Sequence, residues 1–221
     1  QSPENAHTLL LELGYWDVAV DPYPLRLGLP TASPALSLPD LPDEERLDLT
    51  HLPAFAIDDE GSQDPDDALS LDPTSGRLWV HVADVAALVA PNSPADLEAR
   101  SRGANLYLPE GVITMLPSKA TGQLGLGLAE VSPALSFGID LDSAGQVMAM
   151  QVAASRVRVT RLTYEAAAGR LDEASLAGLC RLAQIRRARR LSQGAIVLDL
   201  PEVKMRVDED GRVHIRPLPS L

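Results

Sequence analysis

The chain has 221 residues, of which 45% are hydrophobic and 23% charged, a composition typical of a soluble folded domain. No apolar run approaches the roughly 20 residues of a membrane span. The single cysteine, Cys180, excludes an internal disulfide, so we expect a cytoplasmic protein with no membrane partner. The net charge of −12 argues against a basic nucleic-acid-binding surface over the whole molecule.

Charge is segregated along the chain. Residues 1–72 contain 16 acidic residues and two arginines, a net charge of −14. Residues 155–190 contain nine arginines and three acidic residues, a net charge of +6. The basic segment therefore keeps nucleic acid open as a partner.

The N-terminal region reads as a short helix followed by a connector. Ser2 is a suitable cap, Pro3 suits the first helical turn, and the helix is expected to close at Gly14. Residues 15–46 contain six prolines and little periodicity, which indicates extended chain. We accordingly predict a helix and proline-rich connector over residues 1–47 and a folded domain over residues 48–221.

The next stretch, FAIDDEGSQDPDDALSL from Phe55 to Leu71, places six acidic residues within ten positions between two predicted strands. Asp58, Asp64, Asp66 and Asp67 stand at relative positions 0, 6, 8 and 9. Carboxylates held close together repel one another, and their pKa values rise unless a cation offsets the charge. Mg²⁺ or Mn²⁺ suits such an all-oxygen set, whereas zinc suits it poorly.

The same stretch has two other interpretations. A solvated turn rich in Asp, Gly, Ser and Pro explains the composition without any ligand. A calcium loop of the EF-hand type requires Gly at its sixth position and Glu at its twelfth, but counting from Asp58 those positions hold Gln63 and Leu69. The calcium loop is therefore excluded, and the turn stays open.

The remaining elements follow in chain order. We predict a turn over 72–77, a buried strand in LWVHVADVAAL, a helix over 92–104, an extended segment over 106–109, hairpin strands over 134–142 and 146–163, a helix over 176–193, and a final hairpin in VKMRVDEDGRVHI. These elements predict an α+β fold with mixed, largely antiparallel sheets.

Three sets of polar residues have open roles in this part of the chain. His81 lies in an apolar run and is expected to be a hydrogen-bonded core residue rather than a ligand. Asp84 could cap a turn or support the acidic loop. The arginines between Arg181 and Arg190 would suit either a solvated helix face or contacts with phosphate.

The spacing of Asp58, Asp64, Asp66 and Asp67, followed by Ala68-Leu69, resembles the signature of the ribonuclease II, or RNB, family of exoribonucleases. Three later segments are similar to that family in the same order: VHVADVAALVAPNSPADLEARSRGANLYLPEGVITMLP, RLTYEAAAGRL and AQIRRARRLSQGAIVLDLPEVKMRVDEDG. The similarity covers roughly residues 48–215. One departure is LGLGL at 124–128, which replaces a commoner Cys-Ser-Leu stretch.

The resemblance implies the N-terminal part of an RNB catalytic domain. It further implies a Mg²⁺-dependent 3′-to-5′ exoribonuclease that hydrolyses single-stranded RNA to nucleoside 5′-monophosphates by a two-metal mechanism, with Mn²⁺ as an alternative ion. Asp58, Asp64, Asp66 and Asp67 would be the catalytic and metal-binding residues. Tyr107, which would otherwise be a packing residue, would stack on a nucleotide near the reacting end. A monomer is expected.

The family also has an arginine near the scissile phosphate, in sequence that follows the matched segment, and usually an S1 RNA-binding domain. We therefore expect residues 1–221 alone to be inactive. Two other functions stay open: a non-catalytic RNA-binding or scaffold member of the same fold, and a metal-dependent phosphatase acting on small molecules.

Overall fold

A computed structural model describes residues 2–17, 20–108, 111–198, 200–208 and 210–217, and only the backbone of residues 204 and 206. The chain forms two compact units. The larger comprises residues 37–91 and 119–197, and the smaller comprises residues 1–36, 92–118 and 198–221. No helix in the described ranges is long and apolar enough to cross a membrane.

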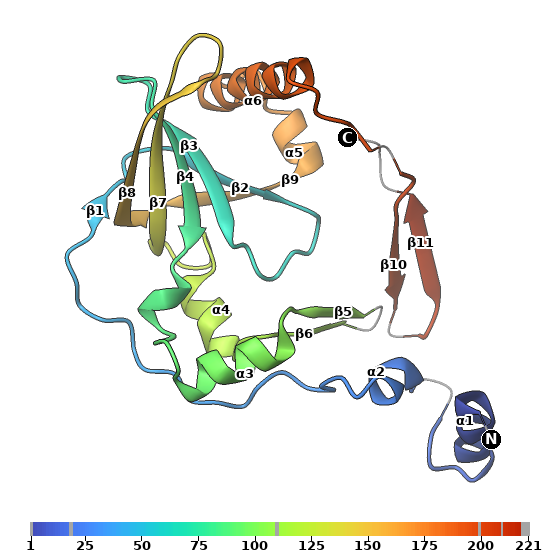
Figure 1. Ribbon diagram of the computed structural model, residues 1–221. Coiled ribbons are helices and arrows are strands. Elements are labelled where there is room, and N and C mark those ends of the chain that lie inside the picture. The colour runs from blue at the N-terminus through green and yellow to red at the C-terminus, as the bar shows by residue number, and fades with distance from the viewer. Residues whose placement is uncertain (1, 18–19, 109–110, 199, 209, 218–221) are drawn as a thin grey trace. The chain divides into compact units, whose positions relative to one another are not determined.

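The larger unit is built on a seven-stranded sheet with the order β1-β8-β7-β4-β3-β2-β9 (Figure 1). β1 pairs with β8 and β9 pairs with β2 in parallel, and all other neighbours are antiparallel. This arrangement confirms the predicted α+β fold with a mixed, largely antiparallel sheet. The strands are β1 (Leu47–Asp48), β2 (Ala54–Asp58), β3 (Asp67–Leu71), β4 (Leu78–Ala83), β7 (Ser132–Leu141), β8 (Val147–Val157) and β9 (Val159–Thr163).

Side chains from the two faces of this sheet enter separate apolar clusters, because successive residues of a strand point to opposite faces. Ala56 of β2 belongs to one cluster, together with Ala68, Trp79 and Leu126. Its neighbour Phe55 belongs to the other, which is completed by α6 (Ala174–Ser192). β2 is therefore packed on both faces, which explains why its run of residues is apolar without alternation.

The structure corrects the predicted strand over residues 146–163. This region forms two strands separated at Arg158: β8 pairs with β7, whereas β9 pairs in parallel with β2. Apolar and polar residues continue to alternate across Arg158, so the sequence gives no local sign that the neighbouring strand changes from β7 to β2. Two helices of this part of the chain, α4 (Ser118–Leu124) and α5 (Tyr164–Ala168), were not predicted, and a short 3₁₀ helix (Val85–Ala87) follows β4.

The smaller unit contains short elements. The first helix is confirmed, with the Ser2 hydroxyl accepting the Asn5 N–H. The predicted connector is interrupted by a helix that Asp21 caps. The helix predicted to reach Ala104 ends earlier because Gly103 adopts a left-handed conformation (φ 77°). The elements are α1 (Pro3–Glu12), α2 (Pro22–Arg26), α3 (Pro94–Arg102), β5 (Leu106–Leu108), β6 (Gly111–Ile113), β10 (Val203–Val207) and β11 (Val213–Pro217).

Two predicted elements of this unit are confirmed for the residues that the structure describes. The extended segment at 106–108 is β5, while Pro109 lies outside the described residues. The final hairpin pairs β10 with β11 in antiparallel register from Val203↔Pro217 to Val207↔Val213.

His81 confirms the expectation of a hydrogen-bonded core residue. It is fully buried, with ring nitrogens 2.9 Å from Ser70 Oγ and 2.7 Å from Ser136 Oγ. Burial lowers the pKa of His81 from its ordinary value of 6.5 to about 4, because the charged ring would lose its hydration. The imidazole is therefore neutral at physiological pH.

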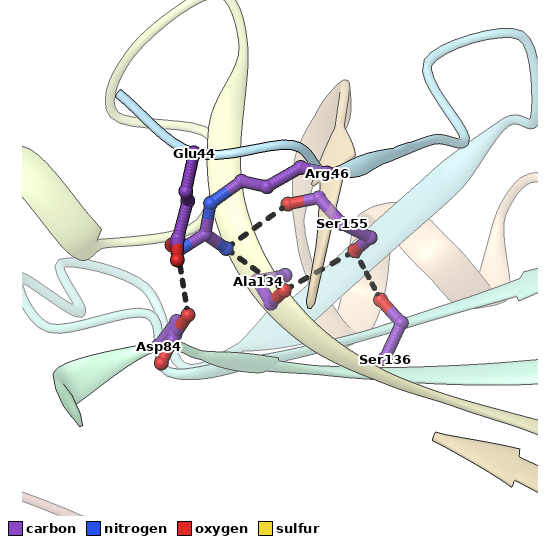
Figure 2. A network of polar contacts seen from close by, with 6 residues as sticks. All are labelled: Glu44, Arg46, Asp84, Ala134, Ser136 and Ser155. Carbon is purple, nitrogen blue, oxygen red and sulfur yellow. Dashed lines mark hydrogen bonds and ion pairs between the residues drawn. The ribbon is translucent and has the colours of Figure 1, made fainter. Parts of the chain in front are cut away.

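Figure 2 shows how Arg46 joins this polar interior. Its side chain is only 5% exposed, and it donates to the carbonyl oxygens of Ala134 and Ser155. It also forms an ion pair of 2.7 Å with Asp84 and a second with Glu44. Asp84 thus pairs with Arg46, and its side chain caps no helix. The domain start near Asp48 stays a prediction, although the chain is already tied into the larger unit at Arg46.

The lowered pKa of His81 predicts a loss of stability in mild acid. Because the folded-state pKa lies below the unfolded value, the unfolded chain takes up the proton first as the pH falls. The stabilisation by neutral His81 is complete above about pH 6.5 and is lost progressively towards pH 4, by about 3 kcal/mol at most. Denaturant unfolding of the wild type and His81→Gln between pH 7.5 and 4.5 should show the two free energies converging. A constant difference would contradict this.

Candidate active site

The candidate site is the loop that joins β2 to β3. Asp58 ends β2 and Asp67 begins β3, so antiparallel pairing places both at the same end of the sheet. The β2–β3 ladder consists of Ala54↔Ser70 and Phe55↔Leu69 and goes no further towards the loop. Beyond it β2 remains paired with β9 as far as Asp58↔Thr163, and β3 remains paired with β4 from Asp67↔Val82. The acidic loop opens between the two strands where they part.

Backbone contacts anchor the loop at three points. Ser62 O accepts a hydrogen bond from Arg161 Nη2, Pro65 O accepts one from the Leu126 N–H at 2.8 Å, and Asp66 O accepts one from the Ala83 N–H at 2.8 Å. Within the loop, Ser62 Oγ donates to the Asp58 carboxylate at 3.2 Å. The loop is therefore fixed to three other segments of the larger unit. Its role as a metal site rather than a solvated turn stays a prediction.

Exposure alternates at the centre of the loop. Pro65 is fully buried, Asp64 is half-buried, and Asp66 and Asp67 are exposed. Burying the proline ring turns the acidic residues on either side of it towards the solvent side of the loop. Side chains that can approach a ligand thus flank a residue held in the core.

The carboxylates influence one another electrostatically. The pKa of Asp67 is raised above its ordinary range, first by its partial burial and then by the negative charges of Asp66 and Asp58. Such mutual repulsion is the condition that the sequence predicted for a carboxylate cluster without a compensating cation. A cation bound here would lower the electrostatic free energy of the loop.

The acidic residues lie at one end of the sheet, but their side chains do not form a complete metal-coordination sphere. Across the described part of the chain, no three His, Cys, Asp or Glu side chains converge closely enough to hold a metal ion. The donor chemistry, however, consists of carboxylate oxygens and so fits a hard divalent cation. Asp58, Asp64, Asp66 and Asp67 therefore remain predicted ligands.

Tyr107 lies on β5 in the smaller unit. Its side chain is 64% exposed, and its hydroxyl lies 3.5 Å from Asn105 Nδ2. An exposed aromatic ring on a short hairpin is compatible with a stacking role. Whether it reaches a nucleotide held by the acidic loop stays a prediction.

The arginine-rich half of α6 lies at the other end of the sheet from the acidic loop (Figure 1). Arg186 Nη1 donates to Gly145 O at 2.6 Å, in the turn that joins β7 to β8. That turn adjoins the end of the sheet at which β3 finishes, as the pairing of Leu71, Leu78 and Ile139 shows, whereas the acidic loop adjoins the beginning of β3. The α6 arginines are therefore poorly placed to neutralise a phosphate at Asp66.

Sequence reasoning missed the residues that hold the loop. Arg161 is 99 positions from its partner Ser62, and Leu126 belongs to the LGLGL stretch, which the sequence marks only as a departure from the family. No local pattern marks a backbone contact of this kind. The one relevant signal was the concentration of glycine and leucine at 124–128.

Comparisons with known proteins agree with this architecture. The model of the RNB domain family matches residues 46–218. A ribonuclease of Synechocystis is 39% identical over 96% of this chain, and a chloroplastic/mitochondrial ribonuclease II of Arabidopsis thaliana is 37% identical over 92%. The chain spans 35% and 28% of the length of these relatives.

Among solved structures, RNase R of Mycoplasma genitalium in complex with ribose-methylated single-stranded RNA superposes with a TM-score of 0.71. It is 28% identical, and the match covers 79% of this chain and 30% of that one. The family match, the strand order and the aspartate spacing all lead to one conclusion: the chain belongs to the RNB domain family.

Proposed function

We propose that the protein containing this chain is a metal-dependent 3′-to-5′ exoribonuclease that degrades single-stranded RNA to nucleoside 5′-monophosphates. The observation that carries the proposal is the acidic loop. Asp58 and Asp67 lie at the same end of the sheet, and partial burial together with the charges of Asp66 and Asp58 raises the pKa of Asp67. A nuclease fits this site because a divalent cation neutralises both the carboxylates and the substrate phosphate.

In this proposal Asp58, Asp64, Asp66 and Asp67 hold Mg²⁺, with Mn²⁺ as an alternative. Divalent ions at such a site would polarise the scissile phosphate and lower the pKa of the attacking water. The carboxylates fix where that charge is concentrated, and the backbone anchors at Ser62, Pro65 and Asp66 restrict how far the loop can shift.

Single-stranded RNA is the proposed substrate for two reasons. The structural relative from Mycoplasma genitalium was solved with single-stranded RNA, and the exposed Tyr107 offers an aromatic surface on which a base could stack. The same reasoning disfavours a phosphatase for small molecules, which would need neither an exposed stacking residue nor an arginine-rich helix.

A non-catalytic RNA-binding member of the same fold is the competing proposal. It is favoured by one observation: the arginine-rich part of α6 is remote from the acidic loop and could bind phosphate without any chemistry. The two proposals differ in what they expect of the acidic loop, which is a metal-binding site in the first and a structural turn in the second.

An assay on the intact protein distinguishes these functions. Single-stranded RNA labelled at its 5′ end should shorten progressively from the 3′ end, with release of nucleoside 5′-monophosphates only when Mg²⁺ or Mn²⁺ is present. RNA binding without shortening would favour the non-catalytic member. Hydrolysis of p-nitrophenyl phosphate with no action on RNA would favour the phosphatase.

Asp66→Asn should reduce RNA hydrolysis by about two orders of magnitude or more, because it removes one anionic ligand and preserves side-chain shape. RNA binding should persist. The metal-free protein should melt at an equal or higher temperature, since the substitution relieves the repulsion that raises the pKa of Asp67. Glu60→Gln is the matched control, an exposed acid of the same loop outside the proposed ligand set. Equal effects of the two substitutions would contradict the assignment.

Tyr107→Ala should lengthen the final RNA product and leave the rate on long RNA almost unchanged. A base–aromatic stack contributes about 1–3 kcal/mol, so a short RNA with few other contacts is released first. Gel analysis of end products tests this, with Tyr15→Ala as the control because Tyr15 is an exposed tyrosine that has no assigned role. End products of wild-type length would show that Tyr107 is a packing residue.

A further inference from the structure

The turn at residues 125–128 touches the acidic loop at its most constrained point. The Leu126 N–H donates to Pro65 O at 2.8 Å, and Leu126 and Pro65 are both fully buried. Leu126 packs in the same apolar cluster as Ala56 of β2 and Ala68 of β3. It therefore occupies the core below the place where the two strands part, and its amide fixes the peptide that connects Pro65 to Asp66.

The turn itself has little freedom to move. Gly127 has a left-handed backbone (φ 81°), and a Cβ atom at this position would lie 2.9 Å from Val159 O. The Gly127 N–H donates to Ser132 Oγ at 3.0 Å. At Gly125, a Cβ atom would lie 2.8 Å from Thr121 O. Both glycines are thus required for steric reasons, and the LGLGL departure has a structural explanation.

The same turn borders the second anchor of the loop. A Cβ atom on Gly127 would lie 3.0 Å from Arg161 Cγ, so the absence of a side chain there leaves room for the arginine stem. Arg161 Nη2 then donates to Ser62 O, and Ser62 Oγ donates to the Asp58 carboxylate. One short turn therefore adjoins contacts that lead to both ends of the acidic loop.

We propose that the Gly125–Leu128 turn and Arg161 position the acidic loop, so that Asp58 and Asp66 can share a divalent cation. The inference rests on the proposed function for the metal-binding role of the carboxylates and for the identity of the reaction. Its physical content is that these contacts, and not the carboxylates alone, determine the affinity of the loop for a divalent cation. None of these residues touches the reacting atoms, so they are positioning residues.

Two substitutions in the intact protein test the arrangement. Arg161→Met keeps the stem that packs near Gly127 and removes the hydrogen bond to Ser62 O. Gly127→Ala introduces a Cβ atom against Val159 O. Arg158→Met is the matched control, since Arg158 is 60% exposed and pairs with Glu130, which is not part of the acidic loop. Arg161→Lys retains one donor and should restore part of the effect.

Three measurements are made on each variant: hydrogen–deuterium exchange of the peptides that contain residues 58–67, Mn²⁺ affinity by electron paramagnetic resonance, and the RNA hydrolysis rate. Arg161→Met and Gly127→Ala should raise exchange selectively in this region and weaken Mn²⁺ binding by about tenfold or more, the usual effect of removing a group that orients metal ligands. kcat should fall while KM for long RNA is unchanged. Arg158→Met should match the wild type.

The outcomes separate this inference from the proposed function. Unchanged exchange, or faster exchange with wild-type Mn²⁺ affinity, would overturn the positioning role, and so would a wild-type protein that binds no Mn²⁺. If the wild type binds Mn²⁺ but does not hydrolyse RNA, the proposed function fails, while the positioning role is still judged by exchange and affinity. If Gly127→Ala does not fold, Arg161→Met and Arg161→Lys carry the test.

Discussion

The parallel pairing of β9 with β2 is the constraint on which the candidate site depends. Five residue pairs, from Ala54↔Val159 to Asp58↔Thr163, hold β2 in place up to its last residue, whereas its ladder with β3 covers only two pairs. Strand β2 can therefore separate from β3 and still be held in the sheet by its hydrogen bonds with β9. A simple hairpin would have closed the space between the strands and left no site between their ends.

The larger unit has two electrostatically different regions, its polar interior and the acidic loop. In the interior, His81 is neutral and hydrogen-bonded to two serines, and Arg46 is paired with Asp84, so these buried groups are satisfied. At the loop, partial burial and the charges of the neighbouring carboxylates raise the pKa of Asp67, and the arginine-rich half of α6 lies at the other end of the sheet (Figure 1). The buried Arg46 and Asp84 thus neutralise each other within the protein, whereas the carboxylates of the loop carry negative charge that a bound cation could neutralise.

Burial of Pro65 connects these two regions. A proline has no N–H to satisfy, so it can enter the core and leave only its carbonyl to be paired, which the Leu126 amide does. The restricted backbone of the proline also limits the conformations open to Asp64. An acidic loop is in this way held to an apolar core through a single buried residue.

The sequence by itself determined the position of the acidic loop and of the strands that flank it. Asp58, Asp64, Asp66 and Asp67 lie within ten positions, and strand periodicity is a local property. The tertiary structure decided which residues hold that loop. Segments far apart in the chain are joined by three interactions: the pairing of β9 with β2, the contact of Leu126 with Pro65 and the contact of Arg161 with Ser62. Such contacts depend on the order of the strands in the sheet and on the space left by a glycine that has no side chain. Neither can be read from the local alternation of apolar and polar residues or from the charge of a segment.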